Sequence, residues 1–245
     1  MSDGTSYIQA LKVRHGGFES SASFATATTT DLRLPQHSPE LILNDAELAR
    51  FRGFQFAAKQ NAFLLGRLAA KRAIGQLLGE PELRHIEIVS GVYGQPLMRH
   101  PRSGDIDVTL SHSQQLAVAL AFPHEYPMGI DLESVAENSA AMLIEEMAAS
   151  DQEKAWITAS PLNIADSCGL LWTAREALGK LLKTGLRSPM NLFSLGEIQP
   201  LDATAWAGNY RYFLQCRSVS RVDAGRVLSI ALPVGVELHP WPGLV

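Results

Sequence analysis

The sequence predicts an α+β fold made of two similar halves within one chain of 245 residues. The first observation is that segments with helical spacing precede segments with strand-like composition, and that this order occurs twice. The second observation is that two helix-start signals lie 106 residues apart. The third is that the strand-like segments are grouped after each long helix, which favours two α+β halves over a doubly wound parallel sheet.

The helices are predicted from their start signals and their apolar spacing. Asn44 with Glu47, and Ser150 with Glu153, match the capping box, in which the two side chains satisfy backbone donors at a helix start. At the same offset, LLGRLAAKRAIGQLLG (64–79) lies opposite LLWTAREALGKLLKTG (170–185). An internal duplication and two unrelated helical hairpins both explain this register.

The strands are predicted from runs rich in β-branched, aromatic and other apolar residues. They lie at 85–89, 105–110, 115–122 and 128–133, and then at 191–195, 210–219 and 226–234. The Ser-, Thr- and Ala-rich segment 19–31 predicts a flexible lead-in, although its Thr run also suits a strand. We therefore expect a flexible N-terminal extension (1–22), an N-terminal half (23–125) and a C-terminal half (126–245).

Composition narrows the class of protein. The net charge of −4 argues against general binding to nucleic acid, and the hydrophobic share of 46% with 19% charged residues is ordinary for a globular protein. The longest apolar runs are too short to cross a membrane. Cys168 and Cys216 have neither the spacing of a metal site nor that of a disulfide framework, so we expect a cytoplasmic location.

Two carboxylates stand close together in GIDLE (129–133). On a strand, Asp131 and Glu133 point to the same side with Cα atoms about 7 Å apart. Two like charges at this spacing raise each other's pKa unless a cation or a water-filled cleft lies between them. On the predicted helix 170–183, Glu176 and Lys180 lie opposite the apolar face, where they form either an ordinary surface pair or part of a site.

Three basic residues of the predicted N-terminal half are candidates for binding an anion. Arg67 and Lys71 lie one helical turn apart among apolar residues, so they either extend their head groups to water or hold an anion such as a phosphate. Arg50 on the preceding helix is placed to join them. His112, between Ser111 and Ser113 at the end of a strand, is compatible with anion binding, although a lone histidine in such a place is more often structural.

These motifs occur in a fixed order: GRLAAK, YGQP, LSHS, GIDLE, WTAREALGK and TGLRSP. In this order, over residues 40 to 195, the chain resembles the Sfp-type 4′-phosphopantetheinyl transferases, and the pairing of GIDxE with WTxxEAxxK is the specific part. The resemblance implies a pseudo-twofold pair of α+β halves with coenzyme A in the cleft between them. It also implies a monomer that transfers 4′-phosphopantetheine from coenzyme A to a serine of an apo acyl or peptidyl carrier protein and releases adenosine 3′,5′-bisphosphate.

The resemblance also implies roles for individual residues. It assigns Mg²⁺ to Asp131, Glu133 and Glu176, and it makes Glu176 the base for the serine proton, directly or through a metal-bound water. It implies that Lys180 contacts the pyrophosphate or the reacting group and that His112 and Ser111 contact the pyrophosphate, so that Lys180 and His112 join Glu176 as catalytic residues. The 3′-phosphate falls to Arg50 and Lys71, with Arg67 as a neighbour. Gln95 and Arg175 stand where family members commonly have lysine.

Two other functions are compatible with these residues. The first is a non-catalytic module that binds coenzyme A or a carrier protein, which Gln95 would favour. The second is a Mg²⁺-dependent phosphohydrolase that uses water as the acceptor. Because carrier proteins are typically acidic around their serine, we expect them to contact a basic and apolar surface near Lys183 and Arg187.

Overall fold

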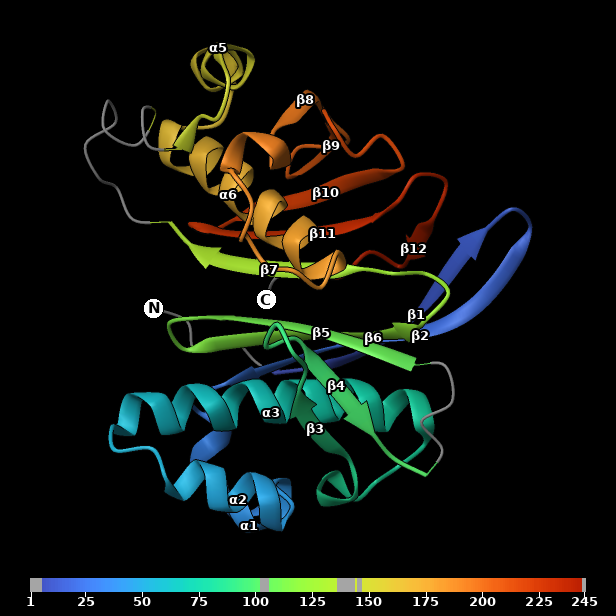
Figure 1. Cartoon of the computed structure of the whole chain (residues 1–245), viewed down its shortest axis with the longest axis vertical. Helices are drawn as coiled ribbons and strands as arrows, with labels where there is room; N and C mark the ends of the chain where they lie inside the picture. The colour runs from blue at the N-terminus through green and yellow to red at the C-terminus, as the bar shows by residue number, and fades with distance from the viewer. Residues whose placement is uncertain (1–5, 102–105, 136–143, 145–146, 244–245) are drawn as a thin grey trace. The chain divides into compact units, whose positions relative to one another are not determined.

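The computed structural model describes residues 6–101, 106–135, 144 and 147–243 (Figure 1). The chain divides into two compact units, of which unit 1 comprises residues 1–127 with 235–243 and unit 2 comprises residues 128–234. Each unit contains a five-stranded antiparallel sheet and a long helix packed on it. The predicted α+β class is therefore confirmed.

Unit 1 is built around the sheet β12-β1-β2-β6-β5. Its strands in this sheet are β1 (Ile8–His15), β2 (Phe18–Thr28), β5 (Ile106–Ser113), β6 (Leu116–Pro123) and β12 (Glu237–His239). A separate hairpin joins β3 (Glu87–Ser90) to β4 (Pro96–Arg99). The helices are α1 (Pro39–Ile42), α2 (Asp45–Arg52) and α3 (Ala57–Leu78), with 3-10 turns at Asp31–Arg33, Pro35–His37 and Leu83–His85.

Small residues allow α3 to lie close to the sheet of unit 1. On the strands, Ala25, Ala27 and Ala119 are fully buried, and on the helix Ala69 and Ala73 are fully buried opposite them. The helix contacts mainly β2 and β6. It ends at Gly79, whose left-handed φ of 65° closes the last turn without the steric cost that a Cβ would add.

The predicted flexible extension (1–22) is wrong over its described part. β1 pairs with β2 along its whole length, and Leu11, Val13 and Ala22 are buried, while residues 1–5 lie outside the described residues. Ser, Thr and Ala suggested flexibility, yet these small side chains fit the close contact between β2 and α3. The expected C-terminal half also differs, because residues 235–243 return to unit 1, where Leu238 pairs with Val13.

Unit 2 is built around the sheet β7-β11-β10-β9-β8. Its strands are β7 (Gly129–Ser134), β8 (Leu195–Pro200), β9 (Ala205–Tyr210), β10 (Cys216–Asp223) and β11 (Arg226–Pro233). Its described helices are α5 (Asp151–Ala159) and α6 (Ile164–Leu181), with a 3-10 turn at Met190–Phe193. The long helix α6 packs on β7, β11 and β10, and its predicted apolar face is confirmed by the burial of Leu171, Ala174 and Leu178.

Two strand predictions in unit 2 are wrong. The segment 191–195 is mostly a 3-10 turn, and the segment 210–219 spans the end of β9, a connection and the start of β10. Aromatic residues misled the second prediction, because Tyr212 and Phe213 lie in that connection and not on a strand. Within the described residues, no helix is both long enough and apolar enough to cross a membrane.

Candidate functional site

Strand β7 and helix α6 bring acidic and basic side chains together in unit 2. Asp131 lies on β7 and is only 4% exposed, whereas Glu133, two residues on, is half-buried on the same side of the strand. Lys180, near the end of α6, donates a hydrogen bond from Nζ to Oδ1 of Asp131 at 2.7 Å. The sequence predicted either a Glu176–Lys180 surface pair or a site, and the bond from Lys180 instead crosses from the helix to the strand.

Gly129 explains how α6 comes so close to β7. A Cβ atom at Gly129 would lie 1.9 Å from the carbonyl oxygen of Ala177 and 2.5 Å from the amide nitrogen of Leu181. Both distances are too short for any real contact, so the helix backbone rests directly on the strand backbone at this point. This contact lies two residues before Asp131 on the strand, and on the helix it involves Ala177 and Leu181, which directly follow Glu176 and Lys180. It therefore brings the strand acids within reach of the helix residues.

Glu176 shows how strongly the acids interact. Burial raises the pKa of its carboxyl, and the neighbouring charges of Asp131 and Glu133 raise it further, while Lys180 opposes them. A carboxyl whose pKa is raised binds a proton more readily, which is a property of a general base. The structure thus gathers all three acidic residues of the predicted metal set in unit 2, close enough to influence one another.

The donor chemistry of these three residues fits a hard cation. Carboxylate oxygens are the protein ligands that Mg²⁺ prefers, and a divalent ion would relieve the repulsion that raises the pKa of Glu176. Among the described residues, no group of three or more His, Cys, Asp or Glu side chains is already spaced as a metal-ligand cluster. One oxygen of Asp131 accepts from Lys180, so that lysine neutralises part of the acidic charge.

Lys71 is placed differently from the prediction that it holds a phosphate. Its side chain is fully buried in unit 1, where Nζ donates to the carbonyl oxygen of Ile42 at 2.7 Å and to the Glu47 carboxylate. Burial lowers the pKa of Lys71, and the Glu47 charge opposes this change. The anion that the sequence pattern demanded is therefore Glu47, and the ammonium group does not reach a ligand at the surface.

Arg67 shares the same partner. Its Nε lies 3.1 Å from Oε1 of Glu47, and its guanidinium donates to the carbonyl oxygen of Ile88 at 3.1 Å. Only 9% of Arg67 is exposed, and burial lowers its pKa. The guanidinium carbon also lies 4.6 Å from the centre of the Phe63 ring, so this residue belongs mainly to the interior of unit 1.

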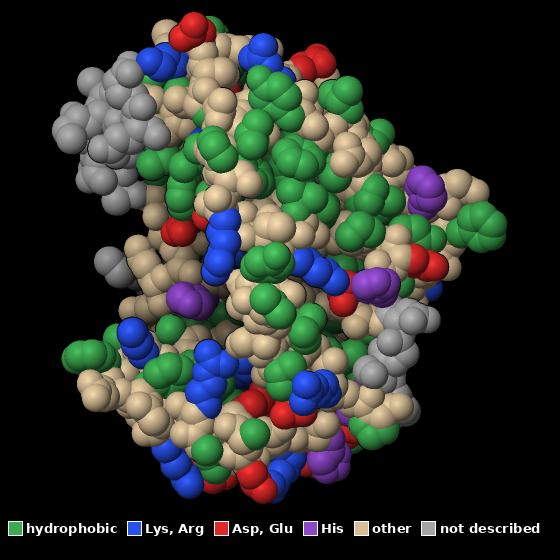
Figure 2. Space-filling view, viewed as in Figure 1, with side chains coloured by type: hydrophobic (Ala, Val, Ile, Leu, Met, Phe, Trp, Pro, Cys, Tyr) green, Lys and Arg blue, Asp and Glu red, His purple; other side chains and the backbone are tan. Residues whose placement is uncertain are grey.

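Arg50 is the member of the predicted cation set whose side chain is exposed. Its guanidinium donates to the Ser90 hydroxyl at 3.0 Å and lies 5.5 Å from the centre of the Phe63 ring. Both contacts leave donor groups of the guanidinium available, because arginine carries five N–H bonds. Figure 2 shows basic side chains over the surface of unit 1, whereas hydrophobic side chains gather over unit 2.

The predicted anion cluster around His112 is divided between two faces of β5. Ser111 and Ser113 are buried on one face, and His112 is exposed on the other, as the alternation of a strand requires. The Ser111 and His112 side chains therefore do not point together at one anion. Gln95 lies in the β3–β4 hairpin, where its Oε1 accepts from the amide of Tyr93 at 2.9 Å.

Unit 2 contains a buried ion pair that was not predicted from the sequence. Arg175 is fully buried on α6 and donates to the carboxylate of Glu153 and to the carbonyl oxygen of Met147. Glu153 had been interpreted only as part of a helix start. A glutamate at the third position of a helix and an arginine on an apolar helix face were the available signals, but nothing in the sequence shows that the two meet.

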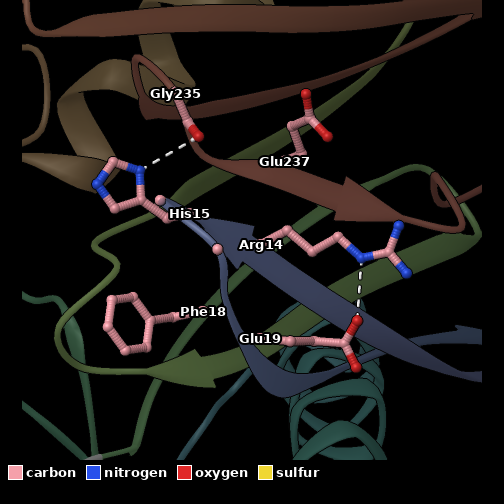
Figure 3. Close-up of a pocket in the computed structure, with 8 residues that line it drawn as sticks. Arg14, His15, Phe18, Glu19, Gly235 and Glu237 are labelled. Carbon is pink, nitrogen blue, oxygen red and sulfur yellow. Dashed lines mark hydrogen bonds and ion pairs between the residues drawn. The ribbon is translucent and has the colours of Figure 1, made fainter.

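A shallow hollow in unit 1 lies apart from every predicted site residue. It lies between the tip of the β1–β2 hairpin and β12, and it is lined by Arg14, His15, Phe18, Glu19 and Glu237 among others (Figure 3). Arg14 donates to Glu19 at 3.0 Å, and Nδ1 of His15 lies 3.2 Å from the carbonyl oxygen of Gly235. Its charged groups are thus largely paired with one another, and we assign it no function.

The comparisons with known proteins agree on one family. The family model of the 4′-phosphopantetheinyl transferase superfamily matches residues 127–229. Holo-[acyl-carrier-protein] synthase of Geobacillus kaustophilus (strain HTA426) is 42% identical over 87 residues, which are 33% of this chain and 67% of that protein. The protein of the same name from Streptococcus agalactiae serotype III (strain NEM316) is 37% identical over 89 residues, which are 34% of this chain and 75% of that protein.

Two further matches are a longer sequence match and one solved structure. The 4′-phosphopantetheinyl transferase gsp of Aneurinibacillus migulanus is 29% identical over 137 residues, which are 56% of this chain and 54% of that protein. The crystal structure of a holo-(acyl-carrier-protein) synthase from Bacillus anthracis str. Ames, in complex with CoA (3′,5′-ADP), matches with a TM-score of 0.36 and 21% identity. That match covers 46% of this chain and 94% of the other.

Proposed function

We propose a magnesium-dependent transfer reaction for this chain, which belongs to the 4′-phosphopantetheinyl transferase superfamily. The reaction moves the 4′-phosphopantetheine arm of coenzyme A to a serine of an apo acyl or peptidyl carrier protein. The observation that carries the proposal is the gathering of Asp131, Glu133, Glu176 and Lys180 in unit 2, within the matched residues 127–229.

The chemical step exchanges one P–O bond for another. The serine oxygen attacks the phosphorus atom on the pantetheine side of the pyrophosphate. The bond from this phosphorus to the bridging oxygen breaks, and adenosine 3′,5′-bisphosphate leaves with the electron pair. Such a step depends on positioning and on neutralising the charge of the phosphate oxygens.

Residues of unit 2 supply these requirements. Asp131, Glu133 and Glu176 are the residues that would hold Mg²⁺, which when bound supplies positive charge to the pyrophosphate oxygens. Glu176 is also the candidate base for the serine proton, because burial raises the pKa of its carboxyl above the ordinary value. Lys180 holds Asp131 in place through its hydrogen bond. Its ammonium group also adds a positive charge to that of the Mg²⁺, on the side of α6 that carries Glu176.

Binding of the two substrates uses other surfaces. We assign the 3′-phosphate of coenzyme A to Arg50, whose guanidinium is exposed, and no longer to Lys71. We assign the acidic carrier protein to the surface near Lys183 and Arg187, because unit 2 also exposes hydrophobic residues such as Leu192 and Leu214. We further propose a cytosolic location, since both cysteines are free thiols. The monomeric state is proposed from the family resemblance alone.

Intact-protein mass spectrometry tests the reaction directly. Apo carrier proteins are incubated with this protein, coenzyme A and Mg²⁺, and a parallel sample contains EDTA. We expect a mass gain of about 340 Da on the carrier that EDTA prevents, as for a metal-assisted transfer. Release of adenosine 3′,5′-bisphosphate without carrier labelling would instead indicate a phosphohydrolase, and coenzyme A binding without either product would indicate a binding module.

A further inference from the structure

Three buried hydroxyl groups form a chain between α6 and the sheet of unit 2. Oγ1 of Thr173 lies 2.7 Å from Oγ of Ser229, and Oγ of Ser229 lies 2.7 Å from Oγ of Ser220. Thr173 and Ser229 are fully buried, and Ser220 is 1% exposed. Three polar groups in an apolar interior are costly unless they satisfy one another, so this arrangement is a specific feature of the packing.

The hydrogen bonds between these three hydroxyls all run in one direction. Oγ1 of Thr173 also donates to the carbonyl oxygen of Gly169 one turn earlier on α6, at 2.9 Å. Each hydroxyl carries a single hydrogen, so all contacts are satisfied together when Ser220 donates to Ser229, Ser229 to Thr173, and Thr173 to Gly169. The chain therefore runs from β10 through β11 to the backbone of α6.

The two ends of the Ser229–Thr173 contact lie beside the candidate site. Ser229 is the partner of Asp131 in the register of β11 with β7, so their side chains are direct neighbours on one face of the sheet. Thr173 precedes Glu176 by three positions, which makes them neighbours along the helix surface. The hydroxyl contact thus joins the residue next to Asp131 to the residue next to Glu176.

The hydroxyl of a tyrosine supports the same segment of α6. The buried hydroxyl of Tyr210 on β9 donates to the carbonyl oxygen of Ala174 at 2.6 Å. Gly129 allows α6 to approach the sheet, but a contact between two bare backbones resists sliding and rotation only weakly. The directional bonds at Thr173 and Ala174 fix the position of the helix along the sheet and its rotation about its own axis.

We propose that Thr173, Ser229 and Ser220 are positioning residues that set the distance between the acids of β7 and the residues Glu176 and Lys180 of α6. This inference deepens the proposed function and rests on it. A displacement of about 1 Å in a site of this kind can lower a rate about 100-fold, so small changes in helix placement have measurable effects. The hydroxyls act through the helix and need no contact with a substrate.

Thr173→Val tests the proposal, because valine keeps the shape of threonine and removes the hydroxyl. We expect kcat for carrier labelling to fall about tenfold, while KM for coenzyme A stays within about twofold, since the lost bond affects the reacting groups and not the nucleotide contacts. Thr173→Ser restores the hydroxyl and should recover most of the rate. Ser229→Ala interrupts the chain from the sheet side and should reproduce the loss.

Two matched variants control for the loss of a hydroxyl elsewhere. Thr158 on α5 makes the same helix bond, to the carbonyl of Lys154 at 3.0 Å, but it is exposed, so Thr158→Val should leave the rate unchanged. Ser23 is buried on β2, and within the described residues its hydroxyl has no hydrogen-bond partner. Ser23→Ala should therefore leave both the rate and the stability intact.

Magnesium binding provides a readout that does not depend on turnover. In calorimetric titrations with MgCl₂, we expect Thr173→Val and Ser229→Ala to bind the ion several-fold more weakly than the unmodified protein, and Thr173→Ser and Thr158→Val to match it. Amide hydrogen exchange should be faster in residues 170–181 of the first two variants. All measurements are made at a temperature at which every variant is folded.

The outcomes separate this inference from the proposed function. If the unmodified protein labels carriers and Thr173→Val matches it in kcat and in magnesium affinity, the positioning role is overturned and the function stands. A lower melting temperature alone would assign these hydroxyls to stability and would equally overturn the role. If the unmodified protein binds Mg²⁺ without labelling any carrier, the function fails, and the magnesium affinities and exchange rates still decide the positioning. If it neither labels nor binds Mg²⁺, both fail.

Discussion

Unit 1 and unit 2 contain the same buried ionic arrangement. In unit 1, Glu47 lies at the third position of α2, where it completes a capping box with Asn44. Its carboxylate also accepts from Lys71 in the middle of α3 and from the amide of Ile88 at the start of the next strand. Lys71 in turn donates to the carbonyl oxygen of Ile42 just before α2.

Unit 2 repeats the buried ion pair, the strand amide contact and the carbonyl contact with other residues. Glu153 lies at the third position of α5, which Ser150 caps. Its carboxylate accepts from Arg175 in the middle of α6 and from the amide of Leu195 at 2.8 Å. Arg175 also donates to the carbonyl oxygen of Met147, before α5.

The difference between the units lies outside this shared arrangement. Around it, unit 1 places the basic residues Arg50 and Arg67 against Phe63, whereas unit 2 places Asp131, Glu133 and Glu176 on β7 and α6. The buried glutamate and its cation therefore stabilise the fold and have no part in the reaction, because both units contain them. The proposed reaction depends on the acidic residues that only unit 2 has.

The largest expected effect comes from an acid that unit 2 alone uses in this way. Asp131→Asn keeps the shape of the side chain and removes the charge, so we expect carrier labelling to fall about 100-fold to 1,000-fold, as when a group that stabilises charge in the transition state is lost. Asp107 on β5 of unit 1 is the matched control, since it also pairs with a base, His124, at 2.8 Å. Labelling by Asp107→Asn should match the unmodified protein, and an equal loss in both variants would remove the distinction between the units.

The next effect concerns the arrangement that both units share. Arg175→Met leaves the buried Glu153 carboxylate without its cation, so it should lower the free energy of unfolding by about 3–5 kcal/mol. Lys71→Met should cost less, because Arg67 still lies 3.1 Å from the Glu47 carboxylate. Urea denaturation measures this loss. At a temperature where the Lys71 variant is folded, its KM for coenzyme A should be unchanged. A selective rise in KM for coenzyme A, absent with dephospho-coenzyme A, would restore Lys71 as a phosphate ligand.

The glycine contacts of the two long helices give a smaller and graded effect. Gly129→Ala places a Cβ against the backbone of α6 at 1.9 Å, so the helix must move. We expect a loss of about 1–3 kcal/mol in stability, as for overpacking, together with lower labelling. Gly66→Ala on α3 meets only the flexible Leu110 side chain at 3.3 Å, and its cost is offset by better helix propensity. Equal losses from both variants would argue against a backbone contact at Gly129.

The smallest effect is expected at Gln95. Gln95→Lys adds a positive charge to the β3–β4 hairpin of unit 1 but removes the bond to the amide of Tyr93. An exposed charge of this kind contributes about 0.2–1 kcal/mol, so KM for coenzyme A should fall no more than about fivefold. Initial rates at several salt concentrations measure this, since the gain should disappear at high salt. A gain that persists at high salt would contradict an electrostatic origin.

Helix starts and helix faces could be predicted from the sequence, because their signals lie within a few residues of one another. The capping signals at Asn44 and Ser150 and the apolar face of α6 depend on residues three or four positions apart, and the structure confirms them. The strands β1 and β2 were missed, because their stability comes from packing under α3 and from pairing with β6 and β12. Such distant contacts leave little trace in composition.

The candidate site shows the same limit. The spacing of Asp131 and Glu133 predicted a shared face, and the resemblance to known transferases added Glu176 and Lys180. The pattern around Lys71 correctly indicated that a cation needed an anion, but it could not show that Glu47, 24 residues away, supplies that anion. A buried ion pair and a phosphate site have the same residues in sequence, and only the fold distinguishes them.

Glu176→Gln is the most direct test of the claim that unit 2 places its acids for chemistry and not for stability. Because the folded protein raises the pKa of Glu176, the ionised carboxylate is less stable in the fold than in the unfolded chain. The unmodified, metal-free protein should therefore lose stability as pH rises above about 4.3, the ordinary value of a glutamate, through the raised pKa. Glutamine has no such loss.

Labelling rate and urea denaturation, measured on one preparation of each protein, decide the matter. We expect the metal-free Glu176→Gln variant to be more stable than the unmodified protein at pH 8, with no difference below pH 4, and to lose carrier labelling. A variant that is less stable at pH 8 and still labels carriers at the normal rate would contradict the account.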